Sequence, residues 1–217
     1  MRSRRILLVG AGSLSAVLAE LLVRGGVERL TLVDNDRLKG GNLVRHSLAL
    51  DDVGQYKAPS LAKRLNQISP HAEAVGLPLA FPGCLQSTAI QCGDFDLIID
   101  CTGSDDVVAA LADLGHSHSA TMCSLSIARS GARMYAYSAT AREFSSERFF
   151  AAVMPCLVED NSELPDADLP WEGVGCWCPV LPVRADAVAL LAARAINWLE
   201  EVVTTTPTGF RVIDRHG

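Results

Sequence analysis

A short apolar run that ends in a glycine turn constrains the fold of this chain more than any other feature. Residues 6–9 (ILLV) are continuously apolar, as in a strand buried on both faces of a sheet. The turn that follows, Gly10-Ala-Gly12-Ser13, opens an Ala/Leu-rich stretch at 14–23, which predicts a helix packed on that sheet. A strand, a glycine turn and a helix in this order predict a site for nucleotide phosphates, because such a turn lets backbone amides approach an anion.

Apolar strands and helices alternate along the rest of the chain. Further strands are predicted at 30–33, 73–80, 95–100, 119–127, 132–138 and 210–213. Helices are predicted at 58–68, 105–114 and 185–203. This alternation favours an α/β fold with a Rossmann-like, mostly parallel sheet flanked by helices. The polar–apolar alternation of 132–138 leaves an antiparallel arrangement open for the later strands.

The length and composition favour one globular domain. With 217 residues and 49% apolar content, the chain can bury a sizeable core, so we expect a single domain over 1–217. Charged residues and prolines interrupt the periodicity at 143–180, where we expect an irregular crossover-type segment.

Charge and hydropathy exclude several classes of partner. The net charge is −6 and no long basic run is present, which argues against nucleic acid. No stretch approaches the roughly 18 uninterrupted apolar residues of a membrane span. The amino terminus has no signal-peptide pattern, and seven cysteines are too few for a disulfide-dense scaffold. We therefore expect a cytoplasmic protein with reduced thiols and no membrane partner.

A polar set after the second strand points to chemistry on phosphates. Asp34 follows residues 30–33, at the position where an acidic residue binds ribose hydroxyls. A dinucleotide-dependent dehydrogenase has no need of the polar residues beyond it, whereas an enzyme acting on ATP needs cations for phosphate charge and a carboxylate for Mg²⁺. These residues are Asp36, Asn42, Arg45 and Lys57.

Taken in order, these motifs resemble the ThiF/MoeB/HesA family, the adenylating fold of ubiquitin-activating enzymes. The motifs are G-x-G-x-L, D-x-D, N-L-x-R and V-G-x-x-K, followed by Ile68-Ser-Pro70 and LIIDCT at 97–102. The resemblance implies an adenylyltransferase that uses ATP and Mg²⁺ to activate the C-terminal carboxylate of a small carrier protein. Such a carrier is ubiquitin-like or a sulfur carrier and ends in glycine. The resemblance also implies a homo- or heterodimer.

The same resemblance implies a role for each matching residue. The turn of Gly10, Gly12 and Ser13 would bind ATP, and Asp34 would bind its ribose. Asp36 would lie near the phosphates or the metal. The triphosphate and the adenylyl-transfer step would depend on a polar set, namely Asn42, Arg45 and Lys57.

The chain departs from the family pattern at two positions beside the expected site. Gly103 stands where relatives carry an aspartate ascribed to Mg²⁺ binding. We expect Asp105 to bind the metal instead, with Asp106 and Asp100 as alternatives. His46 stands where glutamine is common.

A Cys-Trp-Cys sequence follows two glycines late in the irregular segment. Relatives that transfer the activated carrier to a thiol place a cysteine at about this point, so Cys176 is the predicted thioester residue, ahead of Cys178 and Cys156. The alternative is that these are buried or incidental thiols. The two C-x-x-C pairs of a structural zinc site are not present in the sequence.

Two further functions remain open from the sequence. Gly103 and the missing zinc pairs suit a catalytically weak scaffold subunit of a heterodimeric activating enzyme. An NAD-dependent oxidoreductase would explain the glycine turn and Asp34 only.

Overall fold

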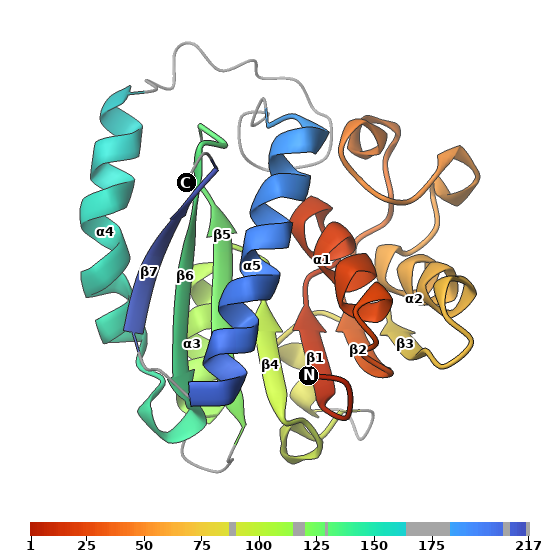
Figure 1. The fold of residues 1–217 in the computed structure, drawn as a ribbon, viewed down its shortest axis with the longest axis horizontal. Helices are drawn as coiled ribbons and strands as arrows, with labels where there is room; N and C mark the ends of the chain where they lie inside the picture. Colours follow the sequence, from red (N-terminus) through yellow and green to blue (C-terminus); the bar gives the residue numbers. More distant parts are fainter. Residues whose placement is uncertain (87–89, 115–119, 129, 164–182, 206–208, 216–217) are drawn as a thin grey trace.

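The computed structural model describes residues 1–86, 90–114, 120–128, 130–163, 183–205 and 209–215. Its centre is a seven-stranded sheet in the order β3-β2-β1-β4-β5-β6-β7 (Figure 1). The strands are β1 (Arg5–Val9), β2 (Arg29–Val33), β3 (Glu73–Leu77), β4 (Leu97–Asp100), β5 (Thr121–Ile127), β6 (Arg133–Thr140) and β7 (Gly209–Asp214). β1 to β5 pair in parallel, whereas β6 is antiparallel to both β5 and β7.

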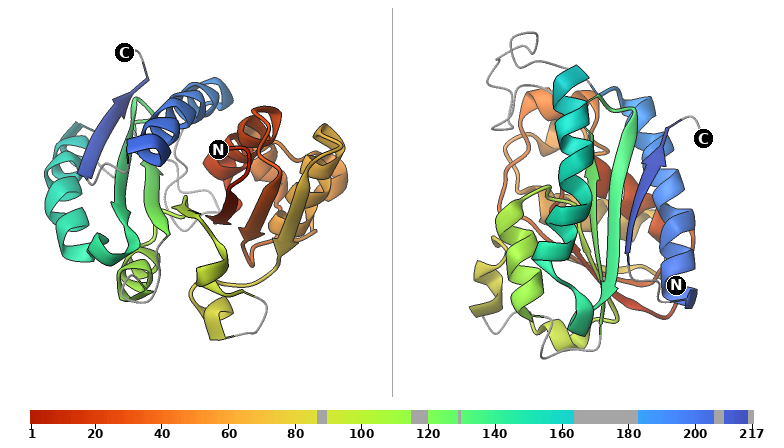
Figure 2. Two further views of the ribbon diagram at one scale, coloured as in Figure 1. Left: turned by 60° about the horizontal axis from the view of Figure 1, so that its bottom comes forward. Right: turned by 90° about the vertical axis from the view of Figure 1, so that its left-hand side faces the viewer.

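Helices cover both faces of the sheet (Figures 1 and 2). They are α1 (Ser13–Arg24), α2 (Lys57–Ile68), α3 (Asp105–Leu114), α4 (Ser146–Glu163) and α5 (Ala185–Thr205). α1, α2 and α5 bury their apolar sides in one core, and α3 and α4 contribute to a second core on the opposite face. The Rossmann-like α/β fold expected from the sequence is confirmed, with its last two strands antiparallel. Among the helices that the structure describes, none has the length and apolar character needed to cross a bilayer.

The strand order reverses beside β1, and folds of this kind bind ligands at the carboxyl ends of the strands at such a position. β2 and β3 lie on one side of β1, and β4 and β5 lie on the other. The connections on the two sides of β1 therefore run across the sheet in opposite directions. In the register, Val9 pairs with Val33 and with Asp100. The residues just after these three strands therefore lie at one level along the carboxyl edge of the sheet.

Part of the segment predicted to be irregular is helical. The sequence predicts an irregular stretch at 143–180, but α4 occupies Ser146–Glu163. Phe149 and Val153 bury one side of this helix, whereas Met154 and Val158 are exposed apolar residues on its other side. Pro155 also lies inside the helix. Apolar residues on both sides and an internal proline hide the helical period in the sequence. The remaining part, 164–180, lies outside the described residues.

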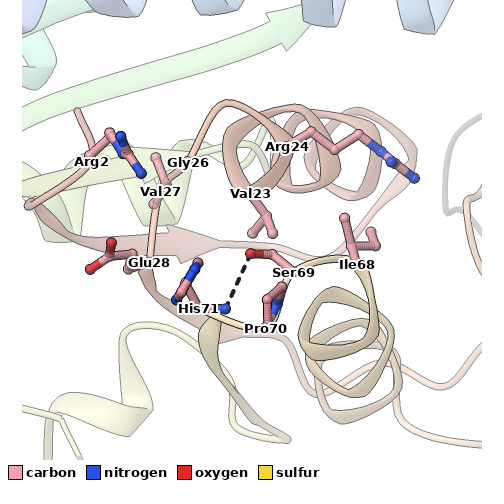
Figure 3. Close-up of a pocket in the computed structure, with 10 residues that line it drawn as sticks. All are labelled: Arg2, Val23, Arg24, Gly26, Val27, Glu28, Ile68, Ser69, Pro70 and His71. Carbon is pink, nitrogen blue, oxygen red and sulfur yellow. Dashed lines mark hydrogen bonds between the residues drawn. The ribbon is translucent and has the colours of Figure 1, made fainter.

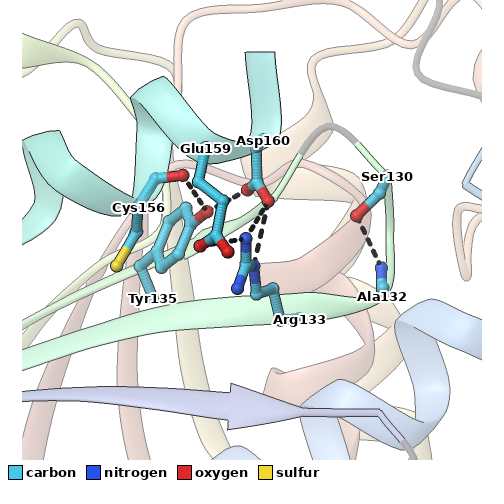
Figure 4. Close-up of polar contacts among 7 residues, drawn as sticks. All are labelled: Ser130, Ala132, Arg133, Tyr135, Cys156, Glu159 and Asp160. Carbon is cyan, nitrogen blue, oxygen red and sulfur yellow. Dashed lines mark hydrogen bonds and ion pairs between the residues drawn. The ribbon is translucent and has the colours of Figure 1, made fainter. Parts of the chain in front are cut away.

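Hydrogen bonds among polar side chains join α4 to β6 (Figure 4). Arg133 Nε lies 2.9 Å from Asp160 Oδ1, and Arg133 Nη2 lies 3.0 Å from Glu159 Oε2. The Tyr135 hydroxyl donates to Asp160, which is only 2% exposed. Burial, and then the bond to Asp160, raises the pKa of Tyr135, so the phenol stays protonated. These contacts hold the last turns of α4 against β6, near residue 163, where this described segment ends.

Gly76 allows α2 to approach β3 closely, and this contact supplies a test of the fold. A Cβ at position 76 would lie 2.1 Å from the Ala58 carbonyl oxygen and 2.6 Å from the Pro59 nitrogen. Both atoms are backbone, so they cannot rotate away. We expect Gly76→Ala to lower the free energy of unfolding by about 3 kcal/mol in urea denaturation.

Gly83→Ala is the matched control, because a Cβ there would meet nothing within 4 Å. We expect it to change the free energy of unfolding by less than about 0.5 kcal/mol. Equal unfolding midpoints for the two variants would contradict the packing described for Gly76.

Candidate active site

The glycine turn after β1 packs against the turn after β4. Gly10 has φ +88°, a left-handed conformation that favours glycine, and its amide donates to the Val33 carbonyl at 2.8 Å. A Cβ on Gly10 would lie 3.0 Å from Thr102 Cγ2. Position 10 therefore requires glycine for both conformation and space.

The start of α1 presents backbone donors at this edge of the sheet. Gly12 is the N-cap residue of α1, with no side-chain cap. Within the part of the chain that the structure describes, the amides of Gly12, Ser13 and Leu14 have no hydrogen-bond partner. Ser15, at the third-glycine position of the dinucleotide fingerprint, is fully buried and its hydroxyl donates to the Gly12 carbonyl at 3.0 Å. Unpaired amides at a helix start suit a phosphate group.

Asp34 joins the ends of β1 and β2. Its Oδ2 accepts the Ala11 amide at 2.6 Å, and its Oδ1 accepts the Asp36 amide at 2.7 Å. A carboxylate can accept about four hydrogen bonds, so both oxygens retain capacity for ligand hydroxyl groups. Asp34 is half-buried beside the turn, as a ribose-binding carboxylate would be.

Lys57 begins α2 and is held by Asp36. Its ammonium lies 2.9 Å from Asp36 Oδ2, and its amide donates to the Asp36 carbonyl at 2.9 Å. The Lys57 side chain is only 8% exposed, whereas that of Asp36 is 63% exposed. Because an ammonium group has three donors, Lys57 can keep this ion pair and still bind a phosphate oxygen.

Asn42 shapes the loop that presents Arg45. The loop contains two 3₁₀ turns, η1 (Gly40–Val44) and η2 (Leu50–Asp52). Asn42 is buried and its Oδ1 accepts the Lys39 amide at 3.0 Å, while its carbonyl accepts the amides of Arg45 and His46. Asn42 Oδ1 therefore forms a hydrogen bond within the loop and stabilises its conformation. Arg45 follows η1 and is half-buried.

His46 makes a contact with the glycine turn that sequence reasoning missed. Its Nε2 lies 2.8 Å from the Ala11 carbonyl oxygen, and its Nδ1 accepts the Leu48 amide at 3.1 Å. His46 is only 8% exposed. Burial lowers the pKa of His46, which keeps the ring neutral at neutral pH. The only signal in the sequence was the departure from the common glutamine.

Asp100 is committed to the turn after β4. It is fully buried; Oδ1 accepts the Thr102 amide at 2.8 Å and hydroxyl at 2.6 Å, and Oδ2 accepts the Ser124 hydroxyl at 2.8 Å. Burial raises the pKa of Asp100, and these hydrogen bonds oppose that rise. Its hydrogen bonds give Asp100 a structural role and make it a poor candidate for the metal.

The remaining candidates for the metal lie just beyond that turn. Asp105 and Asp106 are exposed in the first turn of α3. Gly103 has φ +64°, and a Cβ added to it would have Ser126 Cβ as its nearest neighbour, at 4.0 Å. No cluster of three or more His, Cys, Asp or Glu side chains suited to a metal occurs in the described ranges. Mg²⁺ bound with ATP takes only one or two protein carboxylates, the rest of its shell being phosphate and water, so Asp105 fits this type of site.

The predicted thioester residues, Cys176 and Cys178, lie outside the described residues. Of the described cysteines, Cys84 and Cys123 are buried and Cys101 is half-buried. Burial raises the pKa of all three thiols, which suits small core residues and not nucleophiles. Cys156 lies on α4, where its carbonyl accepts the Tyr135 hydroxyl at 3.3 Å.

A separate pocket of about 350 Å³ lies at the amino ends of the strands (Figure 3). Gly26 and Glu28 border it just before β2, and Ser69 and His71 border it after α2. Asp34 follows the opposite end of β2. This pocket is therefore distinct from the site built around the glycine turn.

Together, the switch point, the unpaired amides of α1 and the carboxylate after β2 define a nucleotide-binding α/β protein of the Rossmann-like class. Residues 1–208 match the ThiF family, and the chain belongs to this family. The resemblance first inferred from the motifs is thereby confirmed.

Relatives and solved structures agree with this assignment. The ATP-dependent ubiquitin transferase-like protein Cap2 of Enterobacter hormaechei subsp. hoffmannii (strain UCI 50) is 36% identical over 94% of this chain and 34% of its own length. ATG7 of Saccharomyces cerevisiae, a ubiquitin-like modifier-activating enzyme, is 32% identical over 52% of this chain and 19% of its own. The chain thus spans about a third or less of these curated relatives.

Two solved structures share the fold. PaaA superimposes with a TM-score of 0.67 at 14% identity, covering 98% of this chain and 61% of PaaA. E. coli MccB with ATP superimposes with a TM-score of 0.64 at 12% identity, covering 99% of this chain and 64% of MccB.

Proposed function

We propose that this chain adenylates the C-terminal carboxylate of a small ubiquitin-like or sulfur-carrier protein at the expense of ATP. One observation carries the proposal: in a ThiF-family chain, a buried lysine is linked by contacts to the glycine turn that precedes the unpaired amides at the start of α1. Lys57 pairs with Asp36, whose amide donates to Asp34, and Asp34 accepts the amide of the glycine turn. The chain thus offers a cation and amide donors at one edge of its sheet.

In this proposal each group acts on a different part of ATP. The α1 amides and Lys57 bind phosphate oxygens, Asp34 accepts from the ribose hydroxyls, and Arg45 supplies a further cation. A carboxylate oxygen of the carrier attacks the α-phosphorus, and the bond from that phosphorus to the bridging oxygen breaks. Pyrophosphate leaves with the bond electrons, and the carrier retains AMP as an acyl-adenylate. Lys57 and Arg45 stabilise the charge that develops on the leaving group.

We propose Asp105 as the residue that would hold magnesium. When bound, the ion would neutralise phosphate charge. Gly103 supplies no carboxylate, and the oxygens of Asp100 are occupied by Thr102 and Ser124. An exposed carboxylate in the first turn of α3 is therefore our choice for the protein ligand.

The carrier and the assembly state extend the same proposal. Relatives include proteins named as adenylyltransferase and sulfurtransferase and as modifier-activating enzymes, and MccB has been solved with MccA. These names support a small protein or peptide substrate. We propose that it ends in glycine, as the family resemblance implies. We further propose a homo- or heterodimer, and a thioester step on Cys176, with Cys178 second.

The adenylation step predicts a loss of ATP–pyrophosphate exchange in two variants. With a candidate carrier ending in Gly-Gly, Arg45→Ala and Lys57→Met should each slow exchange about 100-fold, because each removes a cation that stabilises the leaving group. Lys63→Ala is the matched control, since Lys63 is an exposed cation on the same helix as Lys57. Equal exchange in all three variants, or exchange by none of them and none by wild type, would contradict the proposal. In the latter case, weak binding of ATP in calorimetry would favour the scaffold function.

The metal assignment predicts a change in magnesium dependence. Asp105→Ala should raise the Mg²⁺ concentration needed for half-maximal exchange by roughly tenfold or more, because it removes a ligand of the ion. Asp106→Ala should leave the dependence unchanged. Gly103→Asp should restore it in the Asp105→Ala protein, since position 103 has space for a side chain and aspartate tolerates the left-handed conformation. Identical magnesium dependence for the Asp105 and Asp106 variants would refute the assignment.

The thioester step predicts a covalent adduct that a thiol reagent removes. With ATP and carrier, wild type and Cys178→Ala should form this adduct on a non-reducing gel, and Cys176→Ala should not, because the nucleophile is gone. All three proteins should keep ATP–pyrophosphate exchange, which precedes the thiol step. An adduct that persists in Cys176→Ala would rule out this cysteine.

A further inference from the structure

We propose that His46 is a positioning residue that orients the Ala11–Gly12 peptide of the phosphate-binding turn, so that ATP affinity follows the charge on this imidazole. The inference rests on the proposed function for the identity of the ligand. Its geometric basis, the pair of hydrogen bonds made by the ring, is independent of that function.

The hydrogen bonds fix the tautomer of the ring. The Leu48 amide can only donate, so Nδ1, 3.1 Å away, must accept and carries no proton. The proton of the neutral ring is then on Nε2, which donates to the Ala11 carbonyl oxygen at 2.8 Å. A buried ring with one donor and one acceptor satisfied leaves no polar atom unpaired.

The bond to Ala11 sets the direction of the next amide. In a trans peptide the carbonyl and the N–H point in opposite directions. Because the Ala11 carbonyl points to His46, the Gly12 amide points away from it. That amide has no partner within the described segments, and it belongs to the donor group at the start of α1. Asp34 holds the preceding peptide through the Ala11 amide at 2.6 Å. Two side chains from different segments thus fix both peptides that flank Ala11.

Protonation would disrupt this arrangement. A proton on Nδ1 would place two donors, the ring and the Leu48 amide, against each other at 3.1 Å. The loop or the ring must then move, and the bond that orients the Ala11 carbonyl changes with it. Four influences act on the ring besides burial: Lys57 disfavours the charged form, whereas the Ala11 carbonyl, Asp34 and Asp52 favour it.

The direction in which stability changes with pH follows from the direction of the His46 pKa shift. Burial is the largest influence, and the pKa of His46 in the folded protein lies below 6.5. The unfolded chain therefore takes up this proton first as the pH falls. The stability that neutral His46 contributes is complete above about pH 6.5 and decreases as the pH falls from there through the lowered pKa. ATP affinity should decrease as the folded protein takes up the proton.

Glutamine and leucine variants separate geometry from charge. The amide of His46→Gln offers one donor and one acceptor for the same two partners, but it does not titrate. The leucine of His46→Leu is apolar, so the Ala11 carbonyl and the Leu48 amide both lose their hydrogen bonds to the ring. Neither variant alters the groups proposed to contact ATP.

The test is calorimetric titration of wild type and both variants with ATP and Mg²⁺ at about pH 8 and about pH 5.5. The protonation of ATP itself affects all three proteins equally. Between the two pH values, the affinity of wild type should fall further than that of His46→Gln, by a factor of up to about ten, because the pKa of His46 lies below its ordinary value. At about pH 8, His46→Leu should bind about tenfold more weakly than wild type, and His46→Gln should resemble wild type.

Each alternative outcome is decisive. The same pH dependence in wild type and His46→Gln would overturn the inference, as would equal affinity of wild type and His46→Leu. If His46→Leu does not fold in a thermal denaturation check, the comparison with His46→Gln still decides. If wild type binds no ATP, the proposed function fails, and long-range ¹H–¹⁵N correlation of the ring then tests the geometry alone. The Nε2–H tautomer would support the positioning role, and the Nδ1–H tautomer would reject it.

Discussion

The carboxylate of Asp34 is the interaction on which the site depends. It lies just after β2, yet it accepts the amide of Ala11 from the turn after β1, at 2.6 Å. It also accepts the amide of Asp36, and the Asp36 side chain holds Lys57. One half-buried side chain therefore links the glycine turn, the end of β2 and the first residue of α2. Without it, the hydrogen bond from Gly10 to Val33 and the contacts of Lys57 with Asp36 would remain, but no single side chain would link them.

A second carboxylate has the same role on the other side of β1. Asp100 accepts hydrogen bonds from Thr102 and Ser124. The methyl group of Thr102 in turn lies 3.0 Å from where a Cβ on Gly10 would be. Negative charge at the edge of the sheet is thus used mainly to organise backbone turns. The unpaired amides at the start of α1 and the ammonium of Lys57 are donors at the same edge, which suits an anionic ligand.

The fold could be predicted from the sequence because its strands and helices follow strong periodic patterns. The limits of α3, Asp105–Leu114, were those predicted, since a strand-end turn and two first-turn aspartates mark its start. The helix α4 was missed because a proline and exposed apolar side chains obscure its period.

The candidate site was predictable in its residue types and less so in its contacts. Asp34, Asp36 and Lys57 were placed in one site, and the structure joins them through direct hydrogen bonds. The contact of His46 with Ala11 spans 35 residues and uses a backbone carbonyl, which is the same atom in every residue type. Such a contact leaves no mark in the sequence of its acceptor. For the same reason the use of the Asn42 oxygen within its own loop could not be foreseen.

The close approach of α2 to β3 at Gly76 has a consequence for the candidate site as well as for packing. The carbonyl of Ala58 lies over Gly76, and Lys57 is the preceding residue of the same helical turn. The spacing between the α2 backbone and this edge strand therefore affects where the first residue of α2 lies, and Asp36 then holds the ammonium group of that residue. A position with no side chain, on a strand that contributes no residue to the candidate site, thus supports the helix that carries the cation proposed to act on the phosphates.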